Sequence, residues 1–353
     1  MLWGVHNLED AANDLVTEVG EGLVIDNIEA RVRMHEEELQ RLLDLFAFRT
    51  TDYSLGSRSD EGGELQGLDE FGRPRPSRGR VGRQVQFPIF RAGDAIAFSY
   101  EARIQMTVQM VEDRMTSLMG RDARTLRRWS LSRLLDPAVY AFDDPAGHGE
   151  LTIYGLADGD EFTYLTHDGG EEEDTHYLAQ TNPIGPGADN PFPTIRHEIA
   201  EHPDNDGGQI AAFISPDQRA AVEALPDFRP IQDTNVTPAL SESVLVGALG
   251  VAHPGELIGY TNGVWIIEWS AMPSGYILGV STGAQSRTLA QREHEVSQLR
   301  GFVPQGPRED WPYLERPFVR RAGFGAANRV GAVAYQIGAA SYSRPTGLVA
   351  ARV

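Results

Sequence analysis

The stretch that decides the fold is Arg320-Arg-Ala-Gly-Phe-Gly-Ala-Ala-Asn-Arg329, together with the residues that follow it as far as Pro345. Its glycines predict a turn, and the segment 330–337 after the turn has the alternation of a strand. Large side chains fall on one face of this strand and small ones on the other: Val333, Tyr335 and Ile337 against Ala332 and Ala334. The stretch contains no catalytic pattern, so it indicates architecture rather than chemistry.

The composition predicts a soluble globular chain. Its 353 residues suggest two domains of about 150 residues or one elaborate domain. No apolar run approaches the roughly 18 residues that cross a bilayer, and the N-terminus lacks the basic start and apolar block of a signal peptide. We therefore expect no membrane association, and synthesis and assembly in the cytoplasm.

The chain has no cysteine and no lysine, so all 31 basic residues are arginine. The missing cysteine excludes disulfides, thiol nucleophiles and thiolate zinc sites, and the missing lysine excludes a phosphate-loop lysine and Schiff-base chemistry. The 51 acidic residues give a net charge of -20, which predicts a poor direct binder of nucleic acid. A GC-rich genome would favour arginine over lysine but would not explain the acid excess. Dense carboxylates keep a surface hydrated where salt near 1 M screens charge within about 3 Å, so we expect a halophilic host.

Two segments near the N-terminus have opposite character. Residues 27–49 predict an amphipathic helix, an arm that packs on the body or on a neighbouring subunit, with apolar residues at spacings of three, four and seven. This stripe consists of Ile28, Val32, Leu39, Leu42 and Phe46. Residues 71–93 contain no acid, and their prolines and glycines prevent a helix, although 81–90 could alternate as one arm of a hairpin. The arginines of this segment are Arg73, Arg75, Arg78, Arg80, Arg83 and Arg91.

The middle of the chain predicts one long helix and then a mixture of strands and helices. The longest helical pattern covers 99–136 and ends at Pro137. A hairpin is expected from 151–154 and 161–165, around an Asp-Gly-Asp turn at 158–160. Ser215-Pro-Asp-Gln218 predicts a helix start with a capping box. Further strands are expected at 210–214, 244–249, 264–269 and 276–281.

In this order of elements the sequence resembles the major capsid proteins of tailed viruses, which have the Hong Kong 97 fold. Their closing strand has an Asn-Arg or Glu-Arg entry and a Tyr-x-x-Pro exit, as Asn328-Arg329 and Tyr342-Ser-Arg-Pro345 have here. The turn Met272-Pro-Ser-Gly-Tyr276 also resembles one in capsid axial domains. The resemblance extends over roughly 25–350 and implies an α+β fold with five parts. These are an N-terminal arm (1–60), an extended basic loop (61–98), a peripheral domain with the spine helix (99–190), an axial domain (191–316) and a closing strand returning to the peripheral domain (317–353).

The resemblance also implies a function. The chain would assemble as pentamers and hexamers into an icosahedral shell that encloses double-stranded DNA without sequence-specific binding, in the virion of a virus of a halophilic archaeon. The arm stripe and the arginine loop would contact neighbouring subunits, and the partners would be a portal, a scaffolding protein and a decoration protein. No cofactor, metal or enzymatic activity is implied. Without lysine, the lysine–asparagine cross-link of some capsids of this fold is excluded.

Two alternatives remain open from the sequence. One is an encapsulin-like compartment, which shares the fold but stores cargo enzymes. The other is a serine hydrolase, because Gly279-Val-Ser281-Thr-Gly283 fits the nucleophile-elbow pattern. That class needs an acid and then a histidine after the serine, whereas the last histidine here is His294 and none follows Asp310, so we expect no such triad.

Three further motifs suggest ligand sites without completing one. His197 and His202 lie five apart, about 140° from each other around a helix, which indicates a polar helix surface rather than a zinc motif. Gly323-Phe-Gly325 lacks the third glycine and the context of a dinucleotide fingerprint. An acidic run could hold a hard cation or receive a neighbour's arginine loop, and it consists of Glu171, Glu172, Glu173 and Asp174.

Overall fold

The structure is a computed structural model that describes residues 12–56, 84–168, 170–231, 253–283, 287–306, 308–310 and 313–348. Its helices are α1 Val16–Val19, α2 Glu21–Leu43, α3 Tyr100–Ile104, α4 Val108–Leu135, α5 Pro191–Ala200 and α6 Arg219–Glu223. The strands up to the middle of the chain are β1 Ala47–Thr50, β2 Ser54–Gly56, β3 Gln84–Gln86, β4 Phe90–Ser99, β5 Tyr140–Asp144, β6 Gly149–Ile153, β7 Asp158–Leu165, β8 Glu171–Thr175 and β9 Tyr177–Gln180. The later strands are β10 Ile210–Ile214, β11 Arg229–Pro230, β12 Glu256–Thr261, β13 Val264–Glu268, β14 Tyr276–Ser281, β15 Leu289–Glu293, β16 Phe302–Pro304, β17 Arg308–Asp310, β18 Tyr313–Ala326 and β19 Ala332–Ile337.

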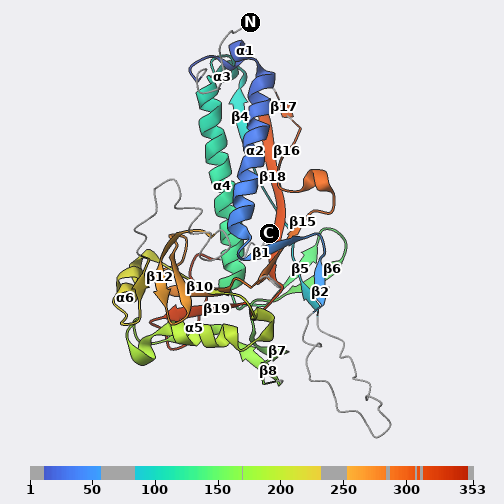
Figure 1. The fold of residues 1–353 in the computed structure, drawn as a ribbon. Helices are drawn as coiled ribbons and strands as arrows, with labels where there is room; N and C mark the ends of the chain where they lie inside the picture. The colour runs from blue at the N-terminus through green and yellow to red at the C-terminus, as the bar shows by residue number, and fades with distance from the viewer. Residues whose placement is uncertain are drawn as a thin grey trace.

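One part of the molecule is a tall column in which α2 and α4 stand beside the long strands β4 and β18 (Figure 1). β4 pairs with β18 antiparallel along ten residues, from Phe90 opposite Ala322 to Ser99 opposite Tyr313. Apolar side chains from both helices and both strands fill the space between them. Thr107 caps α4 by accepting a hydrogen bond from the Met110 amide. The long helix expected at 99–136 is therefore confirmed as α4, preceded by the short α3.

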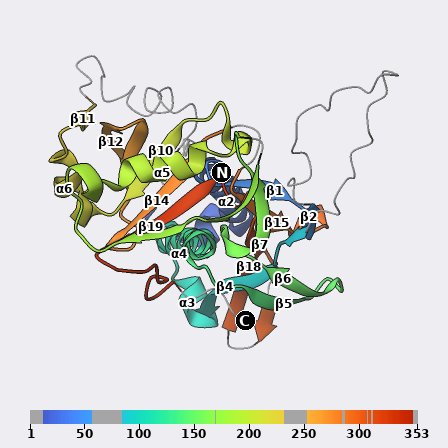
Figure 2. The same cartoon turned by 90° about the horizontal axis from the view of Figure 1, so that it is seen from below.

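The other part is a compact body around a seven-stranded sheet with the order β11-β12-β13-β10-β14-β19-β9. α5 covers one face of this sheet, and the C-terminal end of α4 packs on the other, as the view along α4 shows (Figure 2). β19 separates its side chains as its alternation predicts. Val333 and Tyr335 lie in the cluster under α5, while Ala332 and Ala334 lie in the cluster with α4. The small residues leave room for the helix, so the face assignment of this strand is confirmed.

Several other predicted elements are also confirmed. β10 and β14 have the predicted bounds, and β13 ends one residue before the predicted strand. The capping box at Ser215 and Gln218 is present, and the Gln218 side chain accepts from the Ser215 amide at 3.1 Å. β13 and β14 do not pair across the turn that joins them, because β10 lies between them in the sheet. The strand expected at 244–249 lies outside the described residues.

The single hairpin predicted between 151 and 165 is wrong. β6 pairs with the preceding β5, and β7 pairs with the following β8, so there are two hairpins. The expected turn residues Asp158 to Asp160 form the start of β7 instead. The Asp160 carboxylate is ion-paired with Arg329 at 2.6 Å, a contact 169 residues away that the local turn pattern could not reveal.

Two expected domain boundaries do not coincide with structural units. The boundary at 98 falls inside β4, and the boundary at 316 falls inside β18. The closing segment also divides differently from the expectation, because β18 belongs to the column whereas β19 lies between β14 and β9 in the compact body. Hydrogen bonding between strands distant in sequence sets these units. Among the described residues, no helix combines the length and apolar composition needed to cross a membrane.

Gly323 and Gly325 are explained by close packing rather than by a nucleotide. They stand on the same face of β18, where the segment 86–89 crosses it. A Cβ atom at Gly323 would lie 2.2 Å from the Pro88 carbonyl oxygen, and one at Gly325 would lie 2.8 Å from the Gln86 carbonyl oxygen. Because these neighbours are backbone atoms, they cannot move aside as a flexible side chain would.

We predict that Gly323→Ala lowers the free energy of unfolding by about 1–3 kcal/mol or prevents folding, as overpacking does in other cores. Gly306→Ala is the matched control, since a Cβ atom there meets nothing within 4 Å. Thermal unfolding followed by circular dichroism measures both variants. Equal unfolding midpoints for the two variants would contradict this explanation of the glycine pattern.

Candidate assembly surfaces and the ion pairs that position them

A buried arginine joins α2, α4 and β18, three of the four long elements of the column. Arg320 of β18 donates from Nε to Asp122 Oδ1 of α4 at 2.6 Å, and it also contacts Glu36 of α2 through Nη1 and Nη2. His35 of α2 donates from Nε2 to Asp122 Oδ2 at 3.0 Å. The Arg320 and Asp122 side chains are only 2% and 3% exposed. Two carboxylates thus balance one guanidinium inside the protein, which fixes α2 and α4 against β18.

The electrostatics of this joint favour its charged form. Burial raises the pKa of Asp122, but hydrogen bonds from His35 and Arg320 outweigh it, so the pKa lies below its ordinary value of 3.8. Burial lowers the pKa of Arg320, but Asp122 and Glu36 raise it by more. The pKa of Arg320 therefore lies above its ordinary value. The carboxylate and the guanidinium therefore stay ionised at neutral pH.

A second buried arginine holds the strands that flank residues 57–83. Arg292 of β15 donates to Asp144 Oδ2 at 2.8 Å and to the Phe87 carbonyl at 3.0 Å. The Asp144 carboxylate also accepts from His148, whose ring stacks on Tyr53 next to β2. β2 and β3 pair antiparallel, so the two residues that flank the segment 57–83 lie at one base.

A third arginine, Arg329, anchors the start of β7. Its guanidinium pairs with Asp160, donates to the carbonyl oxygens of Gly155 and Leu156 at 2.8 Å, and lies over the Phe162 ring. The stretch that resembled a capsid closing segment thus supplies two buried cations, Arg320 and Arg329. A buried arginine needs carboxylate partners. The sequence did not indicate which carboxylates these are.

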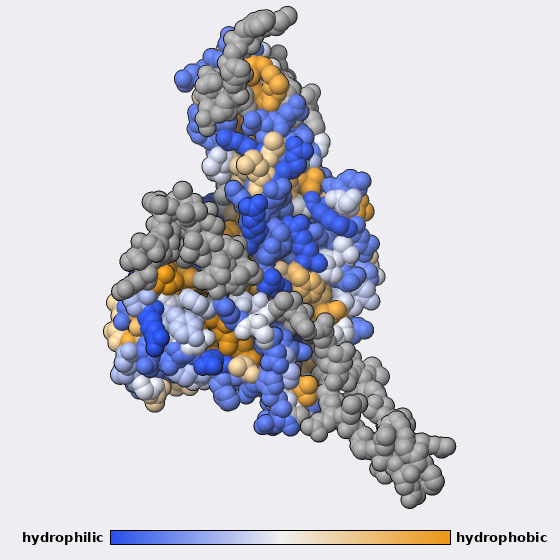
Figure 3. All heavy atoms as spheres, in the orientation of Figure 1, coloured by the Kyte–Doolittle hydropathy of each residue, from blue (hydrophilic) through white to orange (hydrophobic). Residues whose placement is uncertain are grey.

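The arm stripe lies mainly inside the subunit. Val32, Leu39 and Phe46 are buried against the chain itself, and Ile28 is half-buried. Leu42, by contrast, is 37% exposed, because Leu43 occupies the inward position at the end of α2. The prediction of contacts with a neighbour is therefore wrong for the three buried residues, which have no surface left to offer. Among the α2 side chains whose exposure is described, the exposed large apolar ones are Leu23, Met34 and Leu42. Figure 3 shows such apolar spots separated by a mainly hydrophilic surface along the column.

Only one of the six loop arginines lies among the described residues. Arg73, Arg75, Arg78, Arg80 and Arg83 lie outside the described residues. Arg91 is exposed on β4, directly opposite Arg321 of β18. Burial and the Arg91 charge both lower the pKa of Arg321. Arg91 therefore belongs to the column, not to the segment between β2 and β3.

The acidic run separates into two parts. Glu171, Glu172 and Glu173 are exposed on β8, whereas the Asp174 carboxylate contacts the buried rings of His176 and His202. The histidine pair of the sequence is separated as well. The interpretation of a polar helix surface fits His197, whose side chain is 74% exposed, but it is wrong for His202, because α5 ends at Ala200 and the chain then turns inward.

Ser281 lacks the surroundings of a nucleophile. It is buried at the end of β14, and its Oγ accepts a hydrogen bond from the Gly283 amide at 3.2 Å. Its described hydrogen bonds include none to a histidine, in agreement with the failed triad order.

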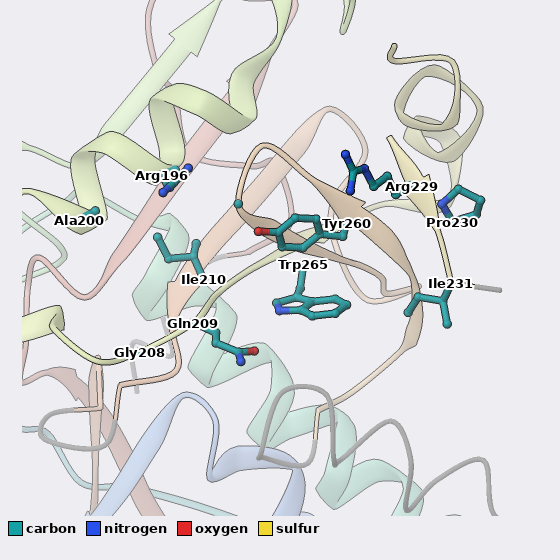
Figure 4. Close-up of a pocket in the computed structure, with 11 residues that line it drawn as sticks. Arg196, Ala200, Gly208, Gln209, Ile210, Arg229, Pro230, Ile231, Tyr260 and Trp265 are labelled. Carbon is teal, nitrogen blue, oxygen red and sulfur yellow. The ribbon is translucent and has the colours of Figure 1, made fainter. Parts of the chain in front are cut away.

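A hollow of about 620 Å³ lies beside α5 and the edge of the seven-stranded sheet (Figure 4). The rings of Tyr260 and Trp265 meet at its centre with centroids 5.0 Å apart, and Arg196 and Arg229 flank them. Exposed aromatic and arginine side chains are typical of protein contact surfaces. Within the described part of the chain, this hollow contains no group arranged for catalysis.

Comparison with known proteins identifies the architecture. A chain from Mycobacterium phage Patience is 18% identical with a TM-score of 0.68, and the match covers 99% of this chain and 98% of that one. This is a capsid-type fold, as two further matches indicate. The capsids of the empty and the native GTA particle are 12% and 11% identical, with TM-scores of 0.51 and 0.50, over 85% of this chain and 90% and 91% of theirs. No protein-family model and no curated protein matches the sequence.

At these identities the comparisons establish the fold alone. The mixture of helices and strands in the column and the compact body fits an α+β capsid fold of the Hong Kong 97 type. The fold class expected from the sequence is therefore supported over nearly the whole chain.

We predict that Arg320→Met destabilises the subunit by roughly 3–5 kcal/mol, because it leaves two carboxylates without their buried partner. Arg124→Met, an exposed arginine on α4, is the control and should change stability by less than about 0.5 kcal/mol. Urea unfolding measures both. A pH series adds a check: the lowered pKa of Asp122 means that its contribution is complete above pH 3.8 and is lost as the pH falls through that lowered value. Similar midpoints for Arg320→Met and the control would refute the role of the joint.

Proposed function

We propose that this protein is the major capsid protein of a tailed virus, which assembles as pentamers and hexamers into an icosahedral shell around double-stranded DNA. The observation that carries the proposal is the structural match over nearly the full length of both chains to a phage chain, joined by matches to two GTA capsids. The protein would then be a structural component of the virion, assembled in the host cytoplasm, and not an enzyme.

The column and the compact body suggest different positions in an assembled shell. The column of α2, α4, β4 and β18 would be the peripheral side of the subunit, and the seven-stranded body would be the axial side, near the centre of each pentamer or hexamer. Residues 57–83 would form the extended loop, because their flanking strands are clamped by Arg292 and its partners. The loop would reach over the adjacent subunit.

The positive charge of the loop arginines indicates which surface of a neighbouring subunit the loop would contact. The loop arginines lie on a chain of net charge -20, so a neighbouring subunit presents mostly carboxylates. Glu171, Glu172 and Glu173 of β8 are exposed and contiguous, which makes them the best candidates for docking. Opposite charges of this kind set register and recognition more than they set affinity.

The net negative charge of the chain also suggests the kind of host and the other assembly partners. The acid excess and the lack of lysine favour a virus of a halophilic archaeon, whose shell would be stable in molar salt. Because lysine cross-links are excluded, strength would come from interlocked loops, charge pairs and a decoration protein. A portal and a scaffolding protein would complete the assembly, and the acidic chain would enclose DNA without reading its sequence.

We predict that the protein forms shells or capsomer rings in molar salt and that these dissociate on dialysis to low salt, as repulsion between carboxylates loses its screening. Light scattering and negative-stain microscopy measure the particle size. A small species at every salt concentration, also with the scaffolding protein co-expressed, would overturn the shell. Particles that contain a co-purified enzyme instead of DNA would favour a cargo compartment.

We predict that the triple variant Arg75→Ala, Arg78→Ala, Arg80→Ala impairs assembly without unfolding the subunit, because it removes the loop charge but no described core contact. The matched control removes three exposed helix arginines, Arg41, Arg124 and Arg128, and so makes the same change in net charge. Particle yield and circular dichroism measure both. Normal particles from the loop variant, or an equal loss in the control, would refute the specific role of the loop.

A further inference from the structure

Four side chains from distant parts of the sequence meet where β8 approaches the end of α5. Asp174 lies near the end of β8, His176 lies between β8 and β9, and Glu201 and His202 directly follow α5. One ligand atom from each lies within 4.8 Å of the ligand atoms of the others. The two imidazole rings are buried, with 0% and 2% of their side chains exposed. Figure 1 shows α5 beside β7 and β8, and the His167 amide links the two regions through the Glu201 carbonyl.

The backbone fixes the protonation of both rings. His176 Nδ1 is 2.8 Å from the Ala332 carbonyl oxygen, and His202 Nδ1 is 3.0 Å from the Leu165 carbonyl oxygen. A carbonyl oxygen only accepts, so each Nδ1 carries a hydrogen and donates it. In the neutral ring, each Nε2 then presents a lone pair. A histidine whose Nδ1 is held by a backbone carbonyl is the usual form of a metal ligand.

Both Nε2 atoms point at the same acceptor. Asp174 Oδ2 is 2.6 Å from His176 Nε2 and 2.9 Å from His202 Nε2, and the two nitrogens are 3.4 Å apart. Glu201 Oε1 lies 3.6 Å from His202 Nε2. Without a positive charge among them, these atoms would present only lone pairs to one another. The cluster therefore requires either protons or a cation at its centre.

Protons satisfy the geometry poorly. One added proton serves one ring and leaves the other Nε2 lone pair facing the carboxylate oxygen at hydrogen-bond distance. Two added protons place two buried imidazolium rings with their nitrogens 3.4 Å apart, and like charges at that distance repel strongly. A single divalent ion serves both rings and both carboxylates at once.

We propose that Asp174, His176, Glu201 and His202 bind one divalent transition-metal ion, with zinc as the best match. Two imidazole nitrogens and two carboxylate oxygens are a suitable tetrahedral set for zinc. Ligands about 2.0–2.1 Å from a tetrahedral ion lie about 3.3–3.4 Å apart, the separation of the two Nε2 atoms here. Asp174 Oδ2 would need to move outward by less than about 1 Å.

The site would be structural. Four protein ligands close the coordination sphere and leave no open position for a substrate. The ion would join the β7–β8 hairpin to the end of α5, and through His176 Nδ1 to the backbone of β19. It would thus fix the hairpin that carries the exposed glutamates to the compact body. The proposal holds whether or not the chain builds a shell.

The test begins with the wild-type protein. Purified without a metal-affinity step and stripped with a chelator, the full chain is titrated with Zn²⁺ and with Co²⁺. We expect one Zn²⁺ per chain by calorimetry, a higher unfolding midpoint on readdition, and strong visible absorption from tetrahedral Co²⁺. Folded, stripped protein that takes up less than about a tenth of an equivalent of Zn²⁺ would overturn the proposal and leave protons as the occupants.

Variants then assign the ligands. His202→Ala and Asp174→Asn should reduce bound Zn²⁺ by about tenfold or more, whereas His197→Ala and His167→Ala, which change exposed histidines near the cluster, should retain it. Circular dichroism confirms that each variant is folded. Since the wild-type titration does not depend on the variants, misfolding of one of them leaves the test intact. Equal loss of Zn²⁺ in a control variant would refute this assignment.

Discussion

The column depends on a charge that has no access to water. Arg320 lies almost wholly inside the protein, where an unpaired guanidinium would be costly, and only α2 and α4 together supply its partners Glu36 and Asp122. The two helices must therefore sit in one position along β18. Because β18 pairs with β4 over ten residues, the joint also determines the position of this pair of long strands.

Buried arginines also hold two other places in the described part of the chain. Arg292 holds the base of the segment between β2 and β3 and the β5–β6 hairpin through Asp144, and Arg329 holds β7 through Asp160. The proposed metal ion would hold β8 of the same hairpin through Asp174. In a chain without lysine or cysteine, bidentate arginines and coordinated cations are available means of fixing extended elements without covalent links. These joints would set the angle at which loops meet neighbouring subunits.

Sequence reasoning succeeded where the signal is local or periodic. The structure confirms three such predictions: the alternation of β19, the capping box at Ser215 and the long pattern of α4. Each of them depends only on residues close together in the sequence. Sequence reasoning failed where distant residues decide. The turn predicted at Asp158 to Asp160 became a strand because Arg329 draws Asp160 to it, and the arm residue Phe46 was buried by the body rather than by a neighbour. The proposed metal site was missed because the sequence paired His202 with His197, five residues away, whereas the fold pairs it with His176.

The sequence by itself determined the long helix α4, the strands β10 and β14, the two faces of β19, and the absence of cysteine and lysine chemistry. These properties follow from residue type and short-range spacing. Only the tertiary structure decided which carboxylate serves each buried arginine, which glycines allow backbones to touch, and that Asp174 leaves its acidic run to face two imidazoles. Such pairings depend on segments that meet only after the chain has folded. No periodicity along the chain encodes them.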